Sequence, residues 1–211
     1  MPYHVPALLL GLIVGIYWAR VVKMVLKQRR QTGRDANFFP RESLGRLLRI
    51  IWYPAVLMWV VVPFFVAFTP FRSPLLTPIA WPIVISWIAV IIAALCLVLT
   101  WICWKKMGKS WRMGIDPNEK TQLIVSGPYA YVRHPIYALQ ILLAVASILT
   151  VPSLAMLIVC GIIIIFLYWE ATREERYLVQ VQGGTYASYM KQVGGFVPRS
   201  LVPYQPAQTA V

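Results

Sequence analysis

Long uninterrupted runs of apolar residues constrain this chain more than any other feature of its sequence. Runs of about 18 or more such residues lie near positions 5–22, 50–69 and 79–104, and each is long enough to cross the hydrocarbon core of a bilayer as a helix. Within a bilayer every backbone polar group needs a partner inside the chain, which favours helices. With 59% hydrophobic residues, 13% charged residues and a mean hydropathy of +0.67, the 211-residue chain is predicted to be an all-α integral membrane protein.

Two shorter apolar runs follow, at residues 136–151 and 153–169. Pro152 and Ser153 separate them with no charged residue between, which predicts two legs of a tight helical hairpin. Each leg is just long enough to span if Trp and Tyr side chains lie at the membrane interface. The prediction is therefore about five transmembrane helices, with a helical hairpin in the C-terminal half.

The basic residues predict an orientation in the membrane. Lys and Arg number nine in residues 20–49, one in 70–78, six in 105–133, none at the hairpin tip and four after residue 170, which accounts for all 20. Nineteen thus lie on alternate connections, which must share one side, and that side is predicted to be cytoplasmic. The first run lacks a preceding basic region and a following cleavage site, so it is expected to be a retained anchor. The N-terminus is predicted outside and the C-terminus in the cytoplasm.

Composition argues against several other classes of protein. The basic residues that give the net charge of +13 flank the apolar runs, and no nucleic-acid motif interrupts them. Attraction to anionic lipid headgroups therefore explains the excess of positive charge better than nucleic-acid binding does. Cys96, Cys103 and Cys160 lie inside apolar runs at spacings that match neither a metal site nor a redox pair, so no metal is expected. The chain also lacks a P-loop, a Rossmann glycine fingerprint and a serine nucleophile elbow.

Most of the remaining polar and acidic residues fall in two segments, 105–137 and 170–199. The hairpin leaves the membrane face at the first segment and returns at the second, so the two are predicted to form one composite site at the cytoplasmic face. We accordingly divide the chain into residues 1–104, with three transmembrane helices and a basic cytoplasmic loop, a functional region at 105–199, and a disordered tail at 200–211.

The stretch "GPYAYVRHPIYALQ" at residues 127–140 opens the hairpin. Pro135 disfavours helical geometry at His134, so a helix is predicted to begin at Pro135 with Arg133 and His134 at its N-terminus, a favourable place for an anionic group. Tyr129 and Tyr137 flank this turn and suit a flat or cationic ligand. The alternative interpretation is that Arg133 and the tyrosines anchor the helix at the headgroups, with His134 as a spectator.

Three glutamates follow the second leg of the hairpin. Glu170 and Glu174 lie four residues apart on one helix face, and Glu170 comes directly after "IIIIFLYW", at a depth where an isolated carboxylate is costly. An alternative is that Arg173 and Arg176 pair with these glutamates on a solvated helix. That alternative does not explain why Glu170 lies so close to the apolar run.

Together these motifs resemble the isoprenylcysteine carboxyl methyltransferases and the related phospholipid methyltransferases of membranes. The resemblance covers about residues 108–198 and rests on the order of its parts around the hairpin. These parts are "LIVSGPYAYVRHPIY", then the Glu174–Glu175 pair, Leu178, Gly183, Tyr186 and Tyr189. Membrane-embedded sterol reductases have a distantly similar C-terminal region.

The resemblance implies S-adenosylmethionine bound at the cytoplasmic face and a lipid or lipidated acceptor that arrives from the bilayer. Beside the resemblance, we predict catalytic roles for three side chains, Arg133, His134 and Glu170, with His134 or a glutamate as the base if the acceptor is an amine. The resemblance also implies a set of cofactor-lining positions on both segments. These are Gln122, Leu123, Ile124, Tyr129, His134, Pro135, Ile136, Tyr137 and Glu174.

Three positions depart from the family pattern and bear on the acceptor. Glu170 stands where the family typically has an arginine that holds the acceptor carboxylate, Gln192 replaces another arginine, and Leu139 replaces a common glycine. A buried glutamate repels a carboxylate, so the acceptor is predicted to be an amine or a neutral lipid rather than a prenylcysteine carboxylate. The competing interpretation is that Glu170 is simply paired with Arg173 or Arg133.

Two other functions remain alternatives to methyl transfer. One is an NADPH-dependent membrane reductase of the sterol type, disfavoured because the tail lacks the tryptophan-rich, cysteine-containing ending expected of those enzymes. The other is a non-catalytic membrane protein that keeps the scaffold.

Overall fold

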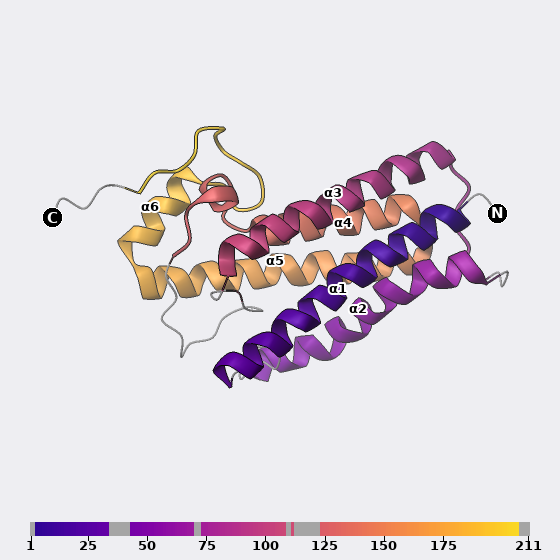
Figure 1. Cartoon of the computed structure of the whole chain (residues 1–211), viewed down its shortest axis with the longest axis horizontal. Helices are drawn as coiled ribbons and strands as arrows, with labels where there is room; N and C mark the ends of the chain where they lie inside the picture. The colour runs from indigo at the N-terminus through magenta and orange to yellow at the C-terminus, as the bar shows by residue number, and fades with distance from the viewer. Residues whose placement is uncertain (1–2, 34–42, 70–72, 109–110, 112–122, 207–211) are drawn as a thin grey trace.

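The computed structural model describes residues 3–33, 43–69, 73–108, 111 and 123–206. Within these ranges the chain is helical, with no β-strand, which confirms the predicted all-α class. Six α-helices and one short 3₁₀ helix follow one another along the chain (Figure 1). They are α1 (His4–Thr32), α2 (Ser43–Phe68), α3 (Ile83–Met107), η2 (Gly127–Ala130), α4 (Pro135–Thr150), α5 (Leu154–Gln182) and α6 (Gly184–Gln192).

Four of these helices, α1, α2, α3 and α5, are long and apolar enough to cross a membrane. Helix α4 is apolar but has only 16 residues, so the fifth predicted span is shorter than the others. Two helices also extend further than the apolar runs that predicted them, α1 to Thr32 and α5 to Gln182. A helix satisfies its own backbone hydrogen bonds and Lys, Arg, Gln and Glu are good helix formers, so it need not end where the apolar run ends.

The hairpin has the predicted tight turn. Helix α4 begins at Pro135, and α5 begins at Leu154, where the Ser153 side chain accepts a hydrogen bond of 3.2 Å from the backbone N–H of Met156. Such a cap satisfies one of the N–H groups that have no partner inside a helix. The tip is tied to the connection between α2 and α3, since the Ile79 N–H donates to the Pro152 carbonyl at 2.8 Å.

The long helices pack into one bundle. In Figure 1, α1 lies beside α2 and α3 lies along α4, while α5 packs against α2 and α4. A buried hydrogen bond of 2.9 Å from Trp59 Nε1 to Ser147 Oγ joins α2 to α4. Small side chains such as Ala93 and Ala144, both fully buried, allow the helices to approach closely. Since α3 and α4 make extensive contact, residues on both sides of the predicted boundary at 104 contribute to the same core.

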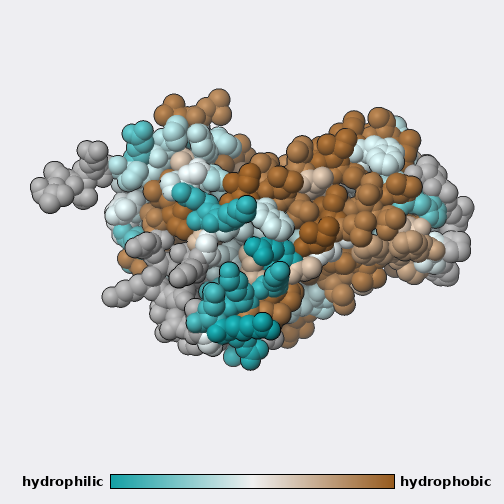
Figure 2. All heavy atoms as spheres, viewed as in Figure 1, coloured by the Kyte–Doolittle hydropathy of each residue, from teal (hydrophilic) through white to brown (hydrophobic). Residues whose placement is uncertain are grey.

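The surface of the bundle is consistent with a membrane environment. Figure 2 shows apolar residues over the helical shafts and hydrophilic ones gathered toward the end where α1 ends and α2 begins. Large apolar side chains that face outward include Ile50, Ile91 and Ile165, each at least 60% exposed. Lipid tails would cover such residues in a bilayer. We refer below to the end that carries the basic last turns of α1 and α3 as the basic end of the bundle.

Candidate functional site

The two polar segments that flank the hairpin meet at the basic end, as predicted. The backbone N–H of Arg133 donates to the Gly194 carbonyl at 2.8 Å, and that of His134 donates to the Gly195 carbonyl at 3.0 Å. Val132 and Gly194 also form an isolated parallel bridge. The residues just before α4 are therefore held by the segment that follows α6, which we call the C-terminal strap (residues 193–199).

Arg133 cross-links this region through its guanidinium group. Its Nε and Nη2 donate to Glu175 Oε1 at 2.9 and 2.7 Å, and its Nη1 donates to the carbonyls of Met190 and Val193. A side chain that is only 8% exposed needs such partners because an unpaired buried charge is costly. Arg133 thus joins the N-terminus of α4 to α5 and to the strap. Most of its N–H donors are therefore used within the protein.

His134 lies at the N-terminus of α4 and is 7% exposed. Its Nε2 is 3.0 Å from Glu175 Oε1 and its Nδ1 is 3.9 Å from Glu174 Oε2. The ring stacks on Tyr137 with a centroid distance of 5.6 Å and an interplanar angle of 7°. His134 is therefore fixed between the two glutamates of α5 and the first turn of its own helix.

A pocket opens beside these residues, which we call the outer pocket. It is lined by six of the predicted cofactor positions and by Arg133, together with two residues, Met107 and Trp111, that the sequence interpretation missed. The six are Tyr129, His134, Pro135, Ile136, Tyr137 and Glu174.

The other predicted cofactor positions lie elsewhere or outside the described residues. Leu123 packs against the cluster of Tyr186, Tyr189 and Val193, and neither it nor Ile124 lines the outer pocket. Gln122 lies outside the residues that the structure describes. The cofactor roles of all three stay predictions.

The first turn of α4 offers hydrogen-bond donors to the outer pocket. The first hydrogen bond of the helix joins the Ala138 N–H to the His134 carbonyl at 2.9 Å, so the N–H groups of Ile136 and Tyr137 precede the helical ladder. Pro135 has no N–H and fits the first helical position. These donors, with the positive end of the helix dipole, favour an anionic group at this wall of the pocket.

Three buried tyrosines support the floor of this region. The Tyr189 hydroxyl donates to the Tyr129 carbonyl and thereby joins α6 to η2. Burial raises the pKa of Tyr129, Tyr186 and Tyr189 well above the usual value for a phenol. Their hydroxyls therefore stay protonated and act as hydrogen-bonding groups rather than as bases.

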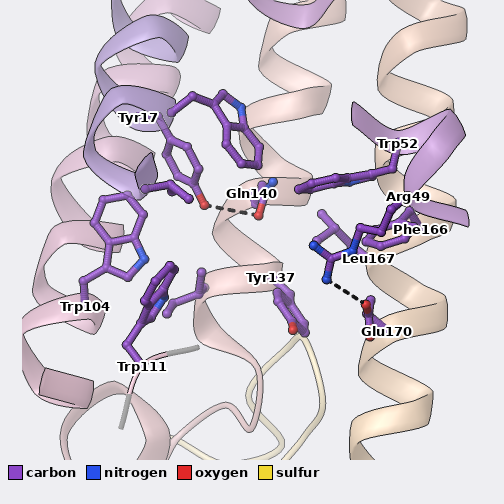
Figure 3. Close-up of a pocket in the computed structure, with 13 residues that line it drawn as sticks. Tyr17, Arg49, Trp52, Trp104, Trp111, Tyr137, Gln140, Phe166, Leu167 and Glu170 are labelled. Carbon is purple, nitrogen blue, oxygen red and sulfur yellow. Dashed lines mark hydrogen bonds and ion pairs between the residues drawn. The ribbon is translucent and has the colours of Figure 1, made fainter. Parts of the chain in front are cut away.

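A second pocket lies deeper in the bundle, which we call the inner pocket. All five long helices contribute to it, and Figure 3 shows aromatic rings around most of its wall. It shares Trp111, Ile136 and Tyr137 with the outer pocket, so the two are adjacent. Its lining is Tyr17, Trp18, Val21, Arg49, Trp52, Trp104, Trp111, Ile136, Tyr137, Gln140, Phe166, Leu167 and Glu170.

Glu170 lines the inner pocket and is paired with two arginines. Its Oε1 is 3.4 Å from Arg49 Nη2, and its Oε2 is 3.1 Å from Arg173 Nη2 (Figure 3 shows the first contact). The pairing with Arg173 is one that the sequence interpretation held open, whereas Arg133 pairs with Glu175 instead. Because the carboxylate is compensated, the prediction of an amine acceptor loses its electrostatic basis.

Arg49 is the partner that sequence reasoning missed. It lies on α2, 121 residues before Glu170, and its side chain is 4% exposed. Its guanidinium lies 5.1 Å from the Trp52 ring and 5.6 Å from the Phe166 ring. Aromatic faces stabilise a buried guanidinium that also has a carboxylate partner.

Metal ligation and disulfide formation are the other kinds of site considered among the described residues. No group of three His, Cys, Asp or Glu side chains there could hold a metal ion. Cys96, Cys103 and Cys160 are buried and free, as expected from their positions in apolar runs.

The fold and the pockets define a helical integral membrane protein with a polar pocket at one end that adjoins an aromatic one between the helices. Residues 87–180 match the model of the isoprenylcysteine carboxyl methyltransferase (ICMT) family, which confirms the resemblance predicted from the sequence. Over this segment, which is less than half of the chain, the protein is similar to that family of membrane methyltransferases. No curated protein matches the chain.

Proposed function

We propose that this chain is a methyltransferase that uses S-adenosylmethionine to methylate a lipophilic acceptor resident in the membrane. The observation that carries the proposal is the adjacency of the two pockets. A polar pocket for a soluble cofactor shares Trp111, Ile136 and Tyr137 with an aromatic pocket that lies between the membrane helices. Methyl transfer needs such an arrangement because the two reactants differ greatly in polarity and must still come within bonding distance.

The residues of the outer pocket fit S-adenosylmethionine. The N–H groups at the start of α4 suit its carboxylate, and the rings of Tyr129 and Tyr137 suit its adenine and sulfonium. Glu174, whose side chain is 23% exposed, offers a carboxylate to the ribose hydroxyls or the ammonium group. Arg133 and His134 position this wall through Glu175.

The bound cofactor supplies an electrophilic methyl group on a sulfonium. In-line displacement at that methyl depends on alignment and on exclusion of water more than on acid–base catalysis. The chain contributes the aromatic rings of Trp111 and Tyr137 where the two pockets meet. It also holds the start of α4 in place through the backbone hydrogen bonds from the C-terminal strap. An amine acceptor would also have to lose a proton, for which His134 or a glutamate of α5 is available.

We also propose that the basic end faces the cytoplasm. Nineteen of the 20 Lys and Arg residues lie on alternate connections, and cytoplasmic connections carry the excess of such residues. This orientation puts the outer pocket in contact with the cytoplasm and the N-terminus on the opposite side.

Calorimetry of the detergent-purified protein tests the proposed cofactor. We expect S-adenosylhomocysteine to bind and NADPH not to bind. Glu174→Gln should weaken S-adenosylhomocysteine binding about tenfold, the effect of losing a charged hydrogen-bond partner. The matched control is Arg176→Gln, an exposed charge on the same helix, which should leave binding unchanged.

Different outcomes would replace the proposal with one of its alternatives. Binding of NADPH in place of S-adenosylhomocysteine would indicate a reductase, and binding of neither would indicate a non-catalytic membrane protein. If S-adenosylhomocysteine binds, labelled S-adenosylmethionine and a total lipid extract should yield a labelled lipid that identifies the acceptor.

A further inference from the structure

The chain after α6 exposes large apolar side chains at the basic end of the bundle. Val197, Leu201 and Val202 are 73%, 88% and 74% exposed, and they lie in a segment that we call the apolar loop (residues 196–203). Figure 2 shows hydrophobic residues at the outer edge of this loop, above more hydrophilic ones. Exposed apolar side chains that gather in this way favour an interaction surface.

Contacts within the protein hold the apolar loop in place. Before the loop, the carbonyls of Gly194 and Gly195 accept hydrogen bonds from the residues just before α4. Within it, Arg199 Nη1 donates to two carbonyls in the last turn of α6, at 3.2 and 2.9 Å. After it, the Tyr204 N–H donates to the Ala130 carbonyl at 2.9 Å. The fold itself therefore keeps the apolar side chains of the loop exposed.

The loop also contacts the outward face of α5. Ile158, Ile165 and Tyr168 are 50%, 72% and 60% exposed and follow one another at helical spacing, so they share this face. The Phe196 ring stacks on the Tyr168 ring with a centroid distance of 5.0 Å and an interplanar angle of 17°. Tyr168 lies two residues before Glu170, at the end of the apolar run, and tyrosine is common at the membrane interface. Phe196 therefore continues the lipid-facing surface of α5 onto the loop.

The direction of the loop keeps it near the depth of this contact. In Figure 1 the yellow loop after α6 projects sideways from the bundle, across the axes of α4 and α5 rather than along them. Helices that span a bilayer lie roughly along its normal, so a segment that projects across their axes stays close to the level where they end. The bilayer interface is therefore the surface that the loop meets.

We propose that the apolar loop inserts into the interfacial region of the bilayer, with Val197 and Leu201 at the boundary between headgroups and acyl chains. Segments that lie in the interface are held there by apolar side chains at this depth. Arg199, the only charged residue of the loop, is exposed and suits the phosphates of the headgroups. The partner of this surface is thus lipid.

Insertion also couples the bilayer to the outer pocket, a consequence that rests on the proposed function. Gly194 and Gly195 directly precede the loop and bind the residues at the start of α4. The Phe196 ring lies 5.9 Å from the His134 ring between centroids. Lipid contact at Val197 therefore stabilises a segment that supports the outer pocket, and loss of this contact should weaken the binding of S-adenosylhomocysteine.

Spin labels on single cysteines test the insertion. The background is the protein with alanine in place of its three buried cysteines, Cys96, Cys103 and Cys160. It is reconstituted in nanodiscs of phosphatidylcholine with a minor share of phosphatidylglycerol. Electron paramagnetic resonance then measures the ratio of two collision rates of the label, one with oxygen, which concentrates in lipid, and one with a nickel chelate, which stays in water.

Two of the labelled positions lie in the loop, Val197→Cys and Leu201→Cys. Ile165→Cys is the lipid-facing reference, and Gln192→Cys, exposed at the end of α6, is the control. The ratio at both loop positions should exceed that at Gln192 about threefold or more, as for side chains roughly 5–10 Å into the boundary between headgroups and acyl chains. Loop labels with the same ratio as Gln192→Cys would overturn the insertion. Labels that neither reagent reaches would also overturn it, since protein rather than lipid would then cover the loop.

Calorimetry in the same nanodiscs tests the coupling. The double variant Val197→Ser and Leu201→Ser should weaken binding of S-adenosylhomocysteine about fivefold, whereas Val181→Ser, 49% exposed in the last turn of α5, should leave it unchanged. Unchanged affinity in the double variant would overturn the coupling. Failure of the proposed function would appear differently, as absent binding of S-adenosylhomocysteine to the wild type, while the spin labels, which need no cofactor, still decide the insertion.

Discussion

At the scale of single residues, Glu175 organises the outer pocket without lining it. One oxygen, Oε1, is the common partner of Arg133 Nε, Arg133 Nη2 and His134 Nε2, at 2.7 to 3.0 Å. A carboxylate that holds several donors in a half-buried position fixes their geometry. The adjacent Glu174 has a different environment: its Oε2 lies 3.9 Å from His134 Nδ1, and its side chain lines the pocket.

This difference predicts that two similar substitutions affect different properties, one mainly the stability and the other mainly the binding of the cofactor. Glu175→Gln should destabilise the protein by about 2 kcal/mol, because it removes the charge that pairs with the buried guanidinium of Arg133. Thermal unfolding in detergent would show this as a lower Tm. Glu174→Gln serves as the control and should change the Tm by less than half as much while it weakens cofactor binding. Equal losses of Tm for the two variants would contradict the distinct roles.

Gly194 in the C-terminal strap permits a close approach of two backbone segments. A Cβ atom at this position would lie 1.9 Å from the Val197 carbonyl oxygen, so Gly194→Ala must displace the strap. The carbonyls of Gly194 and Gly195 bind the N–H groups of Arg133 and His134, so this displacement should weaken S-adenosylhomocysteine binding at least tenfold in calorimetry.

The neighbouring glycine supplies the control for this prediction. A Cβ atom at Gly195 would meet Arg133 Nη2 at 3.4 Å, which is an ordinary van der Waals contact. Gly195→Ala should therefore bind S-adenosylhomocysteine within about twofold of the wild type, since its change requires little displacement. Equal binding of S-adenosylhomocysteine by the Gly194→Ala and Gly195→Ala variants would contradict the role given to the close approach at Gly194.

The inner pocket could not be predicted from the sequence, and Glu170 illustrates why. Its depth after the apolar run was readable, because a carboxylate there needs a partner. The partner from its own helix, Arg173, lies three residues away and was considered. Arg49 is 121 residues distant in the sequence, and only the packing of α2 against α5 brings it to Glu170. Local patterns carry no information about such a contact.

At the scale of elements, the chain after α6 contributes more to the site than its composition indicated. The backbone N–H of Tyr204 donates to the Ala130 carbonyl at 2.9 Å, and its ring packs edge-on against Tyr189 at 5.0 Å between centroids. Tyr189 in turn donates to the Tyr129 carbonyl. Tyr204 thus connects the region predicted as a tail to η2 and to the outer pocket.

Tyr204→Ala should therefore loosen this region. Loss of the ring removes apolar burial against Tyr189, and we expect a destabilisation of about 1–2 kcal/mol with faster proteolysis of the segment after α6. The comparison is Val202→Ala, whose side chain is 74% exposed and which should behave like the wild type. Equal proteolysis rates for Tyr204→Ala and the wild type would contradict a role for this contact.

The elements themselves were largely predictable where a strong local rule applied. Pro135 fixed the start of α4, and the Pro152–Ser153 turn fixed the hairpin, because both act through backbone geometry. The apolar runs did not give the C-terminal ends of α1 and α5, because hydropathy reports where a membrane ends rather than where a helix ends.

At the scale of the whole molecule, the segment that matches the family model contains one pocket but only part of the other. The matched segment, 87–180, contains most of α3 and all of α4, and it includes every described residue that lines the outer pocket. The inner pocket also needs α1 and α2, which lie before that segment and contribute Trp18, Arg49 and Trp52. If the outer pocket binds the cofactor and the inner pocket the acceptor, as we propose, the acceptor can vary through helices outside the matched segment while the cofactor stays the same.

The orientation of the whole bundle gives the last prediction. Cys96, Cys103 and Cys160 are buried, so a variant with alanine at these positions provides a background for single exposed cysteines at the two ends of the bundle. The positive-inside rule predicts that Thr77→Cys, in the connection between α2 and α3, reacts with a membrane-impermeant maleimide in intact cells. Gln192→Cys, at the end of α6, should react only after the cells are permeabilised. The reverse pattern would place the outer pocket, and with it cofactor entry, on the outer side of the membrane.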